Sequence, residues 1–224
     1  MKRSEINALI RDALDFFEEM NFRLPPWATW SPEDWKKHAL NHDEIIDNQL
    51  GWDLTDFGSG AYPDTGLLLF TLRNGNLSLD QKPYAEKIMI VDEEQVTPMH
   101  FHWSKMEDII NRGGGNLMIQ LFPSNEKEEY ANHEFAVSLD GIRRKLKPGD
   151  VVRLTPGESI TLYQGLYHKF YGEKGKGRVL VGEVSAVNDD HSDNRFHEPV
   201  GRFPDIDEDE APLHLLVGDY QNYI

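Results

Sequence analysis

The sequence has 224 residues, a formal net charge of −16 at pH 7 and no cysteine. A chain of this length can bury the core of one domain, and the lack of cysteine excludes disulfides and favours a cytoplasmic protein. The acidic balance argues against a nucleic-acid or anionic-membrane partner, because those partners attract basic surfaces. The longest apolar run, residues 66–72, is too short to span a bilayer, and the first residues do not resemble a secretory signal.

The first part of the chain predicts helices. Ser4 stands where an N-cap residue is expected, and apolar residues follow it at helical spacing: Ile6, Leu9, Ile10, Ala13, Phe16, Phe17 and Met20. A shorter helix is expected after Ser31, because Pro32 suits a first turn and Glu33 complements the helix dipole. We expect residues 1–64 to form helices and a connecting segment that pack on a barrel formed by residues 65–224.

From residue 65 onward the pattern changes to short strands separated by turn residues. The expected strands cover residues 66–72, 87–91, 96–102, 107–110, 116–122, 134–139, 142–146, 151–154, 159–163, 167–171 and 178–185. Such spacing indicates a mainly β fold, with a closed or sandwiched antiparallel sheet. The acidic residues 204–210 predict a solvated loop, and residues 213–217 could return as a strand or pack on a neighbouring element.

Residues 99–107 are the most informative segment of the chain. If the segment is extended, His100 and His102 point to one face, while Phe101 and Trp103 point to the other. A short turn would then bring Glu107 beside the two imidazoles. Imidazole with carboxylate, and no thiolate, suits manganese, iron, cobalt, nickel or zinc at a site left open to substrate. For the two histidines alone, a partly exposed strand is the simpler interpretation.

A second segment, residues 157–171, strengthens the prediction of a metal site. It contains a strand, a turn at Gly165 and another strand that can carry His168 inward. Together the two segments resemble the two motifs of the cupin family. The matching residues are His100, His102, Glu107 and Gly114 in the first motif, and Gly157, Gly165 and His168 in the second.

Three turn positions depart from the cupin motifs. Glu94, Tyr163 and Gly172 stand where glycine, proline and asparagine are usual. These departures affect local turn geometry more than metal binding, since all four ligand positions are present. The resemblance implies a cupin barrel, of the double-stranded β-helix or jelly-roll type, with a metal held by His100, His102, Glu107 and His168.

Four protein ligands on a six-coordinate metal would leave two neighbouring positions open. A sugar could chelate there through adjacent carbonyl and hydroxyl oxygens, and a carboxylate could then move a proton between the neighbouring carbons. Iron could instead take dioxygen and a substrate oxygen, which would give an oxygenase. A non-catalytic cupin that binds a sugar is the third alternative, and the ligand set alone does not separate the three.

A closer resemblance lies in residues 85–91, 100–115 and 182–191. With these segments the chain resembles the D-lyxose ketol-isomerase family over nearly its whole length. The resemblance implies a manganese-dependent homodimer that interconverts D-lyxose and D-xylulose, with weaker activity on related aldoses such as D-mannose. It places the family's metal ligands at His100, His102, Glu107 and His168. The lack of a basic cluster near the motifs favours an unphosphorylated sugar.

Five further residues are candidates for catalysis and sugar binding. Glu183 lies in an apolar strand, where a buried carboxylate acts either as a proton-transferring base or in a structural ion pair. Lys105 either reaches the metal-bound oxygens of the substrate or is a turn lysine in solvent. Asp190 and Arg195 lie in a polar loop that either binds sugar hydroxyls or is solvated. Lys87 would contact the substrate if its strand turns it toward the barrel interior.

Overall fold

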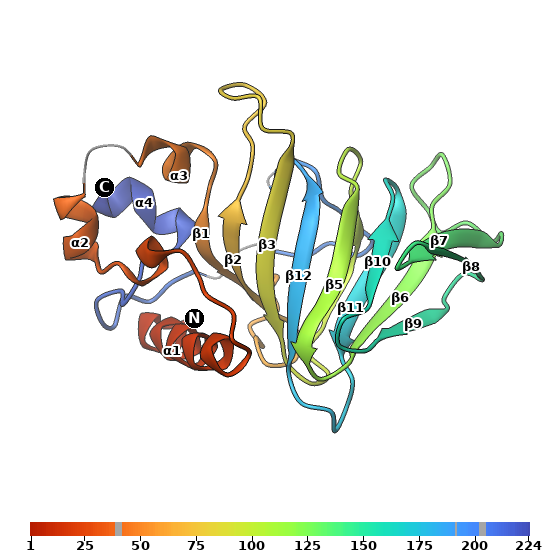
Figure 1. Ribbon diagram of the computed structural model, residues 1–224, viewed down its shortest axis with the longest axis horizontal. Coiled ribbons are helices and arrows are strands. Elements are labelled where there is room, and N and C mark those ends of the chain that lie inside the picture. Colours follow the sequence, from red (N-terminus) through yellow and green to blue (C-terminus); the bar gives the residue numbers. More distant parts are fainter. Residues whose placement is uncertain (39–41, 191, 202–204) are drawn as a thin grey trace.

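The computed structural model describes residues 1–38, 42–190, 192–201 and 205–224. His191 and Pro204, which belong to segments considered above, lie outside the described residues. Helices lie on one side of the molecule and strands on the other, and both chain ends lie on the helical side (Figure 1). The helical elements are α1 (Arg3–Glu19), η1 (Pro26–Thr29), α2 (Pro32–Lys37), α3 (Asp43–Asp47), η2 (Val217–Asp219) and α4 (Tyr220–Tyr223).

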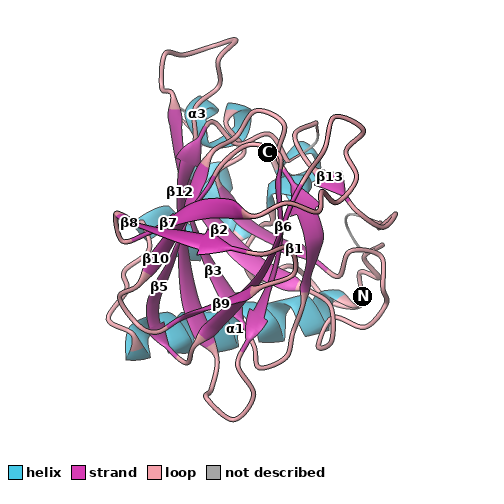
Figure 2. Ribbon diagram, turned by 90° about the vertical axis from the view of Figure 1, so that its right-hand side faces the viewer, coloured by secondary structure: helices cyan, strands magenta, loops and turns pink. Residues whose placement is uncertain are grey.

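Two antiparallel sheets wrap around a common interior (Figure 2). The larger has the order β1-β2-β3-β12-β5-β10-β7-β8, and the smaller has the order β13-β4-β11-β6-β9. The strands are β1 (Gly51–Thr55), β2 (Leu67–Arg73), β3 (Tyr84–Val91), β4 (Thr97–Phe101), β5 (Glu107–Gly114), β6 (Leu117–Pro123), β7 (Phe135–Leu139), β8 (Ile142–Leu146), β9 (Val151–Leu154), β10 (Ser159–Leu162), β11 (Leu166–Gly172), β12 (Val179–Ala186) and β13 (Arg195–Phe196). The predicted mainly β, cupin-type barrel with N-terminal helices is confirmed.

The large sheet is buried on both faces at its centre. Along β2, Leu67 and Leu69 belong to the core between the sheets, whereas Leu68 and Phe70 belong to the core beneath α1. Side chains alternate along a strand, so burial on both faces requires the continuous apolar run that the sequence shows. The same alternation fixes the inward face of the neighbouring strands, and that face carries the site described below.

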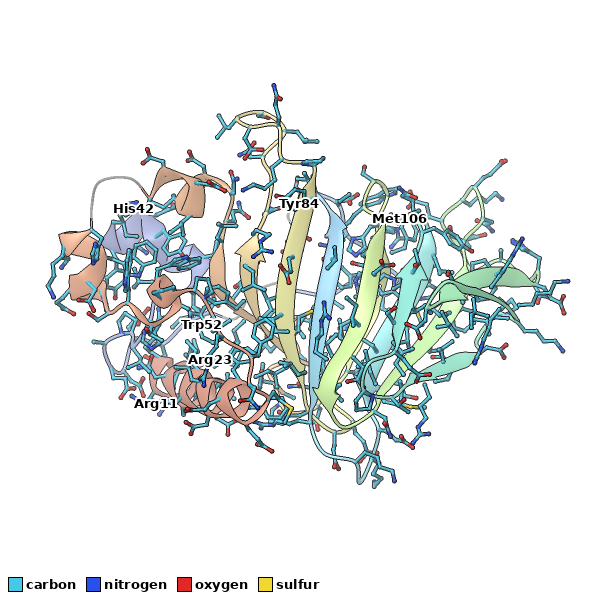
Figure 3. The ribbon with its side chains drawn as sticks, viewed as in Figure 1. Arg11, Arg23, His42, Trp52, Tyr84 and Met106 are labelled. Atoms are coloured by element: carbon cyan, nitrogen blue, oxygen red, sulfur yellow. The ribbon has the colours of Figure 1, made fainter. Side chains whose placement is uncertain are left out.

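Helix α1 covers the outer face of this sheet. Its apolar stripe, which includes Ile6, Ile10 and Phe17, packs against β2, β3 and β12. Trp52, labelled in Figure 3, lies in this interface, and its indole nitrogen donates to the carbonyl of Ala28 at 2.7 Å. Of the described part of the chain, no helix is long and apolar enough to cross a membrane.

Strand β1 was not predicted. It lies in residues 1–64, which were expected to form only helices and a connecting segment. It pairs antiparallel with β2, so the sheet begins before residue 65. Trp52 and Leu54 point to the helical layer, which leaves Asp53 and Thr55 on the inward face. Two inward polar residues weaken the apolar signal of a short strand, and this explains why sequence patterning missed it.

The acidic segment 205–210 is an exposed loop, as predicted, but it also contacts the first residues of helix α1. The backbone of Asp207 forms a bridge with Lys2, and the Asp209 carboxylate accepts from the amide and hydroxyl of Ser4. Helix α1 therefore begins at Arg3, with Lys2 rather than Ser4 in the N-cap position. Carboxylates at a helix N-terminus satisfy free amides and complement the helix dipole, so this acidic segment has a structural role.

The C-terminal segment packs on the helical layer rather than forming a strand. Leu216 makes an isolated bridge with Trp52 and lies in the core beneath α1. The second predicted helix is confirmed, because Ser31 caps α2 by accepting from the amide of Asp34 at 3.2 Å. The N-terminal and C-terminal segments thus form one layer against the barrel.

We expect replacement of Arg3 by methionine to lower the free energy of unfolding by about 3–5 kcal/mol. The Arg3 guanidinium is fully buried and donates to both carboxylate oxygens of Asp219, at 2.8 and 2.9 Å. Methionine would leave the buried Asp219 charge without its counterion. Urea unfolding measures the change, and Arg23→Met is the control, since Arg23 and Glu18 form an exposed pair at 3.8 Å. Equal effects of the two substitutions would contradict the structural role of Arg3.

Candidate metal centre and active site

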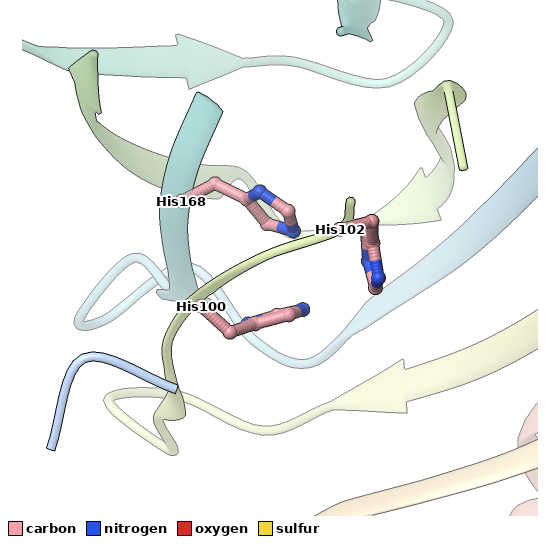
Figure 4. Close-up of side chains that lie close together, drawn as sticks. All are labelled: His100, His102 and His168. Carbon is pink, nitrogen blue, oxygen red and sulfur yellow. The ribbon is translucent and has the colours of Figure 1, made fainter. Parts of the chain in front are cut away.

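Three histidines meet inside the barrel (Figure 4). His100 lies on β4, His102 directly follows that strand, and His168 lies on β11 opposite His100 in the antiparallel register. One ring nitrogen from each imidazole lies within 4.8 Å of the others, and all three residues are buried. The predicted His-x-His geometry, with both rings on one face, is therefore what the strand produces.

The backbone fixes which nitrogen of each ring faces the centre. The Nδ1 atoms of His100, His102 and His168 lie 2.7, 2.7 and 3.0 Å from the carbonyl oxygens of Pro98, Asp193 and Leu166. A carbonyl only accepts, so each neutral ring carries its proton on Nδ1 and presents the Nε2 lone pair inward. Burial lowers the pKa of His100 well below its usual value, with His168 and His102 adding to the effect, which favours the neutral ligand form.

Glu107 completes the donor set. Its Oε1 lies 3.0 Å from His168 Nε2 and 3.5 Å from His102 Nε2. With both ring protons on Nδ1, these contacts place acceptors against acceptors, and within the described ranges Oε1 has no hydrogen-bond donor. A divalent cation among these atoms would satisfy all of them, so the residues present fit the metal that the motif implies.

Charged neighbours decide the ionisation of Glu107. Burial alone raises its pKa, but the Lys105 ammonium outweighs burial and holds the pKa well below its usual value. Nζ of Lys105 lies 2.8 Å from Glu107 Oε2, the oxygen that does not face the histidines. Glu107 is thus held as a carboxylate with one oxygen directed at the histidines.

Lys105 bridges Glu107 and Glu183. Its Nζ lies 2.8 Å from Glu183 Oε1 and 3.2 Å from Asn188 Oδ1. The side chain is only 3% exposed, so the alternative of a turn lysine in solvent is wrong. Burial lowers the pKa of Lys105, but Glu107 and Glu183 outweigh burial and raise the pKa, which keeps the ammonium charged.

Glu183 and Lys87 reach the same cavity by strand alternation. On β12, Val179 and Val181 face the core between the sheets, and Glu183 continues that face. On β3, Met89 faces the same core, and Lys87 is its inward neighbour. Register pairing sets Glu183 beside Lys87 on adjacent strands.

Asp190 joins the cavity from the loop after β12. Its carboxylate accepts from Lys87 Nζ at 3.0 and 3.2 Å. Burial raises the pKa of Asp190, but Lys87 and Lys105 lower it below its usual value. Asp190 therefore presents a negative charge to the cavity.

The cavity is lined by polar and apolar side chains. The polar lining consists of the three histidines, Glu107, Lys105, Glu183, Lys87 and Asp190 together with other residues, and the apolar lining includes Phe57, Met89 and Phe196. Arg195 does not line it, because its Nε donates to Glu128 Oε2 at 2.9 Å. The predicted contact between Arg195 and a sugar stays a prediction.

Two departures from the cupin motifs lie at one point of the fold. Glu94 adopts a φ of 58°, the left-handed conformation that the expected glycine would favour. Its amide donates to the carbonyl of Gly172 at 2.9 Å. A Cβ atom at position 172 would lie 2.5 Å from the carbonyl oxygen of Asp92, so the close approach accounts for glycine there. Glu94 and Gly172 therefore meet at one turn of this chain.

Several site residues were missed because their contacts are distant in sequence. Asp53 and Thr55 line the cavity from β1, the strand that patterning did not find. Asp193 accepts from the amides of Ser104 and Lys105, at 2.8 and 2.9 Å, in addition to its contact with His102. The polar loop after β12 was the only sequence signal for Asn188 and Asp193.

A barrel of two antiparallel sheets, with three histidines and a glutamate converging inside it, defines a cupin with a pocket suited to a divalent metal. The chain belongs to the D-lyxose isomerase family, whose model matches residues 1–220. It is 49% identical over 226 residues to a D-lyxose/D-mannose isomerase of Escherichia coli O157:H7 and 48% identical over 229 residues to one of Serratia proteamaculans. Each alignment covers 100% of both chains. The family resemblance inferred from the sequence is thereby confirmed.

Solved structures are similar in fold at low sequence identity. The L-ribose isomerase of Cellulomonas parahominis without ligand superposes with a TM-score of 0.61 at 15% identity. A variant of the Acinetobacter sp. DL28 L-ribose isomerase in complex with L-ribose gives 0.61 at 13% identity. Both alignments cover 92% of this chain and 98% of the other chain. These likenesses support the barrel fold.

Proposed function

We propose that this chain is a metal-dependent aldose–ketose isomerase that interconverts D-lyxose and D-xylulose, with activity also on D-mannose and D-fructose. One observation carries the proposal: the buried carboxylate of Glu183 shares a lysine ammonium with Glu107, in the cavity that holds the three-histidine group. Membership of the D-lyxose isomerase family supports the reaction class, and the relatives' names suggest the sugars.

His100, His102, Glu107 and His168 would hold the metal, for which we propose Mn²⁺. Nitrogen and carboxylate donors also accept Co²⁺, Fe²⁺, Ni²⁺ or Zn²⁺, so the proposal for manganese rests on the family resemblance. When bound, the metal supplies a Lewis acid that polarises adjacent carbonyl and hydroxyl oxygens of an open-chain sugar.

Glu183 is the proposed proton carrier. It would take a proton from the carbon beside the carbonyl and return it to the carbonyl carbon, while the hydroxyl proton moves to the former carbonyl oxygen, as aldose–ketose interconversion requires. The Lys105 ammonium would hold the Glu183 carboxylate in place and donate a hydrogen bond to a sugar oxygen. Burial of this pair excludes bulk water from the transferred proton.

Asp190 is the proposed acceptor for sugar hydroxyls, and Lys87 would hold it in position. Both lysines that line the cavity within the described ranges are paired with carboxylates, which leaves no free cation among them for a phosphate. This pairing supports a free sugar rather than a sugar phosphate.

A panel of free aldoses tests the proposed function. Under anaerobic conditions, the Mn²⁺-loaded protein should form D-xylulose from D-lyxose and D-fructose from D-mannose, measured by chromatography of the products. An oxygenase of the same fold would require dioxygen, and a sugar-binding cupin would retain the aldose unchanged. Failure to form ketose from any aldose, with metal bound, would contradict the proposal.

Two further properties are proposed from the sequence and the family resemblance: assembly as a homodimer and a cytoplasmic location. Sedimentation equilibrium tests the first, with about twice the mass of one chain expected, and fractionation of cells tests the second. A monomer in sedimentation would leave the proposed chemistry unchanged, because every residue invoked above lies in one chain.

A further inference from the structure

Asp193 contacts the segment of the candidate active site that carries His102 and Lys105. Its main-chain carbonyl accepts from Nδ1 of His102 at 2.7 Å. Its carboxylate accepts from the amide of Ser104 through Oδ1 at 2.8 Å and from the amide of Lys105 through Oδ2 at 2.9 Å. The residue is 8% exposed. One residue of the loop after β12 thus holds the metal-binding segment at three points.

The two amide contacts set where the Lys105 side chain begins. Residues 102–106 lie outside strands β4 and β5. Their carbonyls are held by other segments: His102 accepts from the amide of Gly165 at 2.9 Å, Ser104 from Nε2 of Gln164 at 3.0 Å, and Met106 from the amide of Ala186 at 3.0 Å. The carboxylate of Asp193 supplies the acceptors for two successive amides of this connection, those of Ser104 and Lys105. From that backbone position, Lys105 Nζ reaches Glu107 Oε2 and Glu183 Oε1, both at 2.8 Å.

We propose that Asp193 is a positioning residue that acts through Lys105. It fixes the backbone of Lys105, so that the ammonium lies between the carboxylate that completes the metal donor set and the carboxylate proposed to carry the proton. This inference rests on the proposed function for its effect on turnover. Its effect on the Ser104 and Lys105 amides does not depend on that function.

Asp193→Asn separates positioning from bulk. Asparagine has the same shape but one acceptor oxygen in place of two, so it can accept only one of the two amides without turning an NH₂ group toward the other. Asp193→Ala removes both acceptors. The main-chain carbonyl that holds His102 is present in every variant.

Backbone amide exchange tests the proposed contact directly. By NMR of the metal-free and Zn²⁺-loaded protein, Asp193→Asn should speed exchange at Ser104 or Lys105 by about tenfold, with Asp193→Ala affecting both amides. The matched control is Asp80→Asn, because Asp80 also accepts from backbone amides, those of Lys82 and Asn76, outside the cavity. Unchanged exchange at both Ser104 and Lys105 would overturn the proposal, whatever the protein catalyses.

A double-mutant cycle on turnover tests whether Asp193 acts through Lys105. In the Mn²⁺-loaded protein, Asp193→Asn should lower kcat by about ten- to a hundredfold and change KM less, since misplaced groups slow the chemical step. In a Lys105→Met background, the same substitution should lower kcat by less than about threefold. Additive losses would show that Asp193 acts independently of Lys105 and would overturn the inference. Ketose formation by the unsubstituted protein shows separately whether the proposed function holds.

Discussion

Replacing Glu183 by glutamine is expected to lower kcat by about a hundredfold or more while the metal stays bound. Glutamine keeps the size of the side chain and an oxygen that can accept from Lys105, but it cannot take up a proton at neutral pH. Glu183 is not among the metal donors, so metal content should equal that of the unsubstituted protein. Ketose formation and elemental analysis on the same sample measure the two quantities.

The control for this substitution is Glu86→Gln. Glu86 lies on β3 next to Lys87 in sequence but pairs with Arg73 outside the cavity. The Glu86→Gln variant should therefore keep the turnover of the unsubstituted protein. Near-normal kcat in Glu183→Gln would assign proton transfer to another group in the cavity, and loss of metal would assign Glu183 to the metal centre.

Replacing His168 by alanine should remove metal binding and turnover together. The substitution deletes one of three convergent Nε2 donors and leaves a cavity beside Glu107 Oε1. We expect turnover no higher than that of chelator-treated protein, and metal affinity lower by about a hundredfold or more, since even loss of an outer partner costs that much at some sites. Calorimetric titration with Mn²⁺ measures the affinity.

His214→Ala is a matched control for His168→Ala. His214 is also a buried histidine, and its Nδ1 lies 3.1 Å from a carbonyl, that of Trp30, but it belongs to the helical layer. The His214→Ala variant should be less stable but should still bind metal. Full metal occupancy and turnover in His168→Ala would contradict the assignment of the metal centre.

The fold was predictable because most strands of the barrel carry local signals. Strands β2 and β3 show apolar runs bounded by turn residues, and the two motif segments fix the pair of strands that carries the histidines. Strand β1 and the contacts of the acidic segment with α1 were not predictable in this way. Their roles depend on partners far along the chain, as in the contact between Asp209 and Ser4, and no local pattern encodes such contacts.

The same difference between local patterns and distant contacts applies to the site. His100 and His102 are two residues apart on one face, so alternation alone brings them together. Lys105 had two interpretations in the sequence, and only the fold, which buries it between Glu107 and Glu183, decides between them. Asp193 had no interpretation, because its function as an amide acceptor appears only when the loop after β12 folds back onto the metal-binding segment.

The most direct test of the central claim is turnover of D-lyxose as a function of bound metal. Chelator-treated protein would be titrated with Mn²⁺ under anaerobic conditions, with D-xylulose formation and bound manganese measured at each step. We expect no turnover without metal, and a linear rise that ends at about one Mn²⁺ per chain. D-Xylulose formation at full rate in protein free of metal would contradict the account, as would its absence in protein that holds one Mn²⁺ per chain.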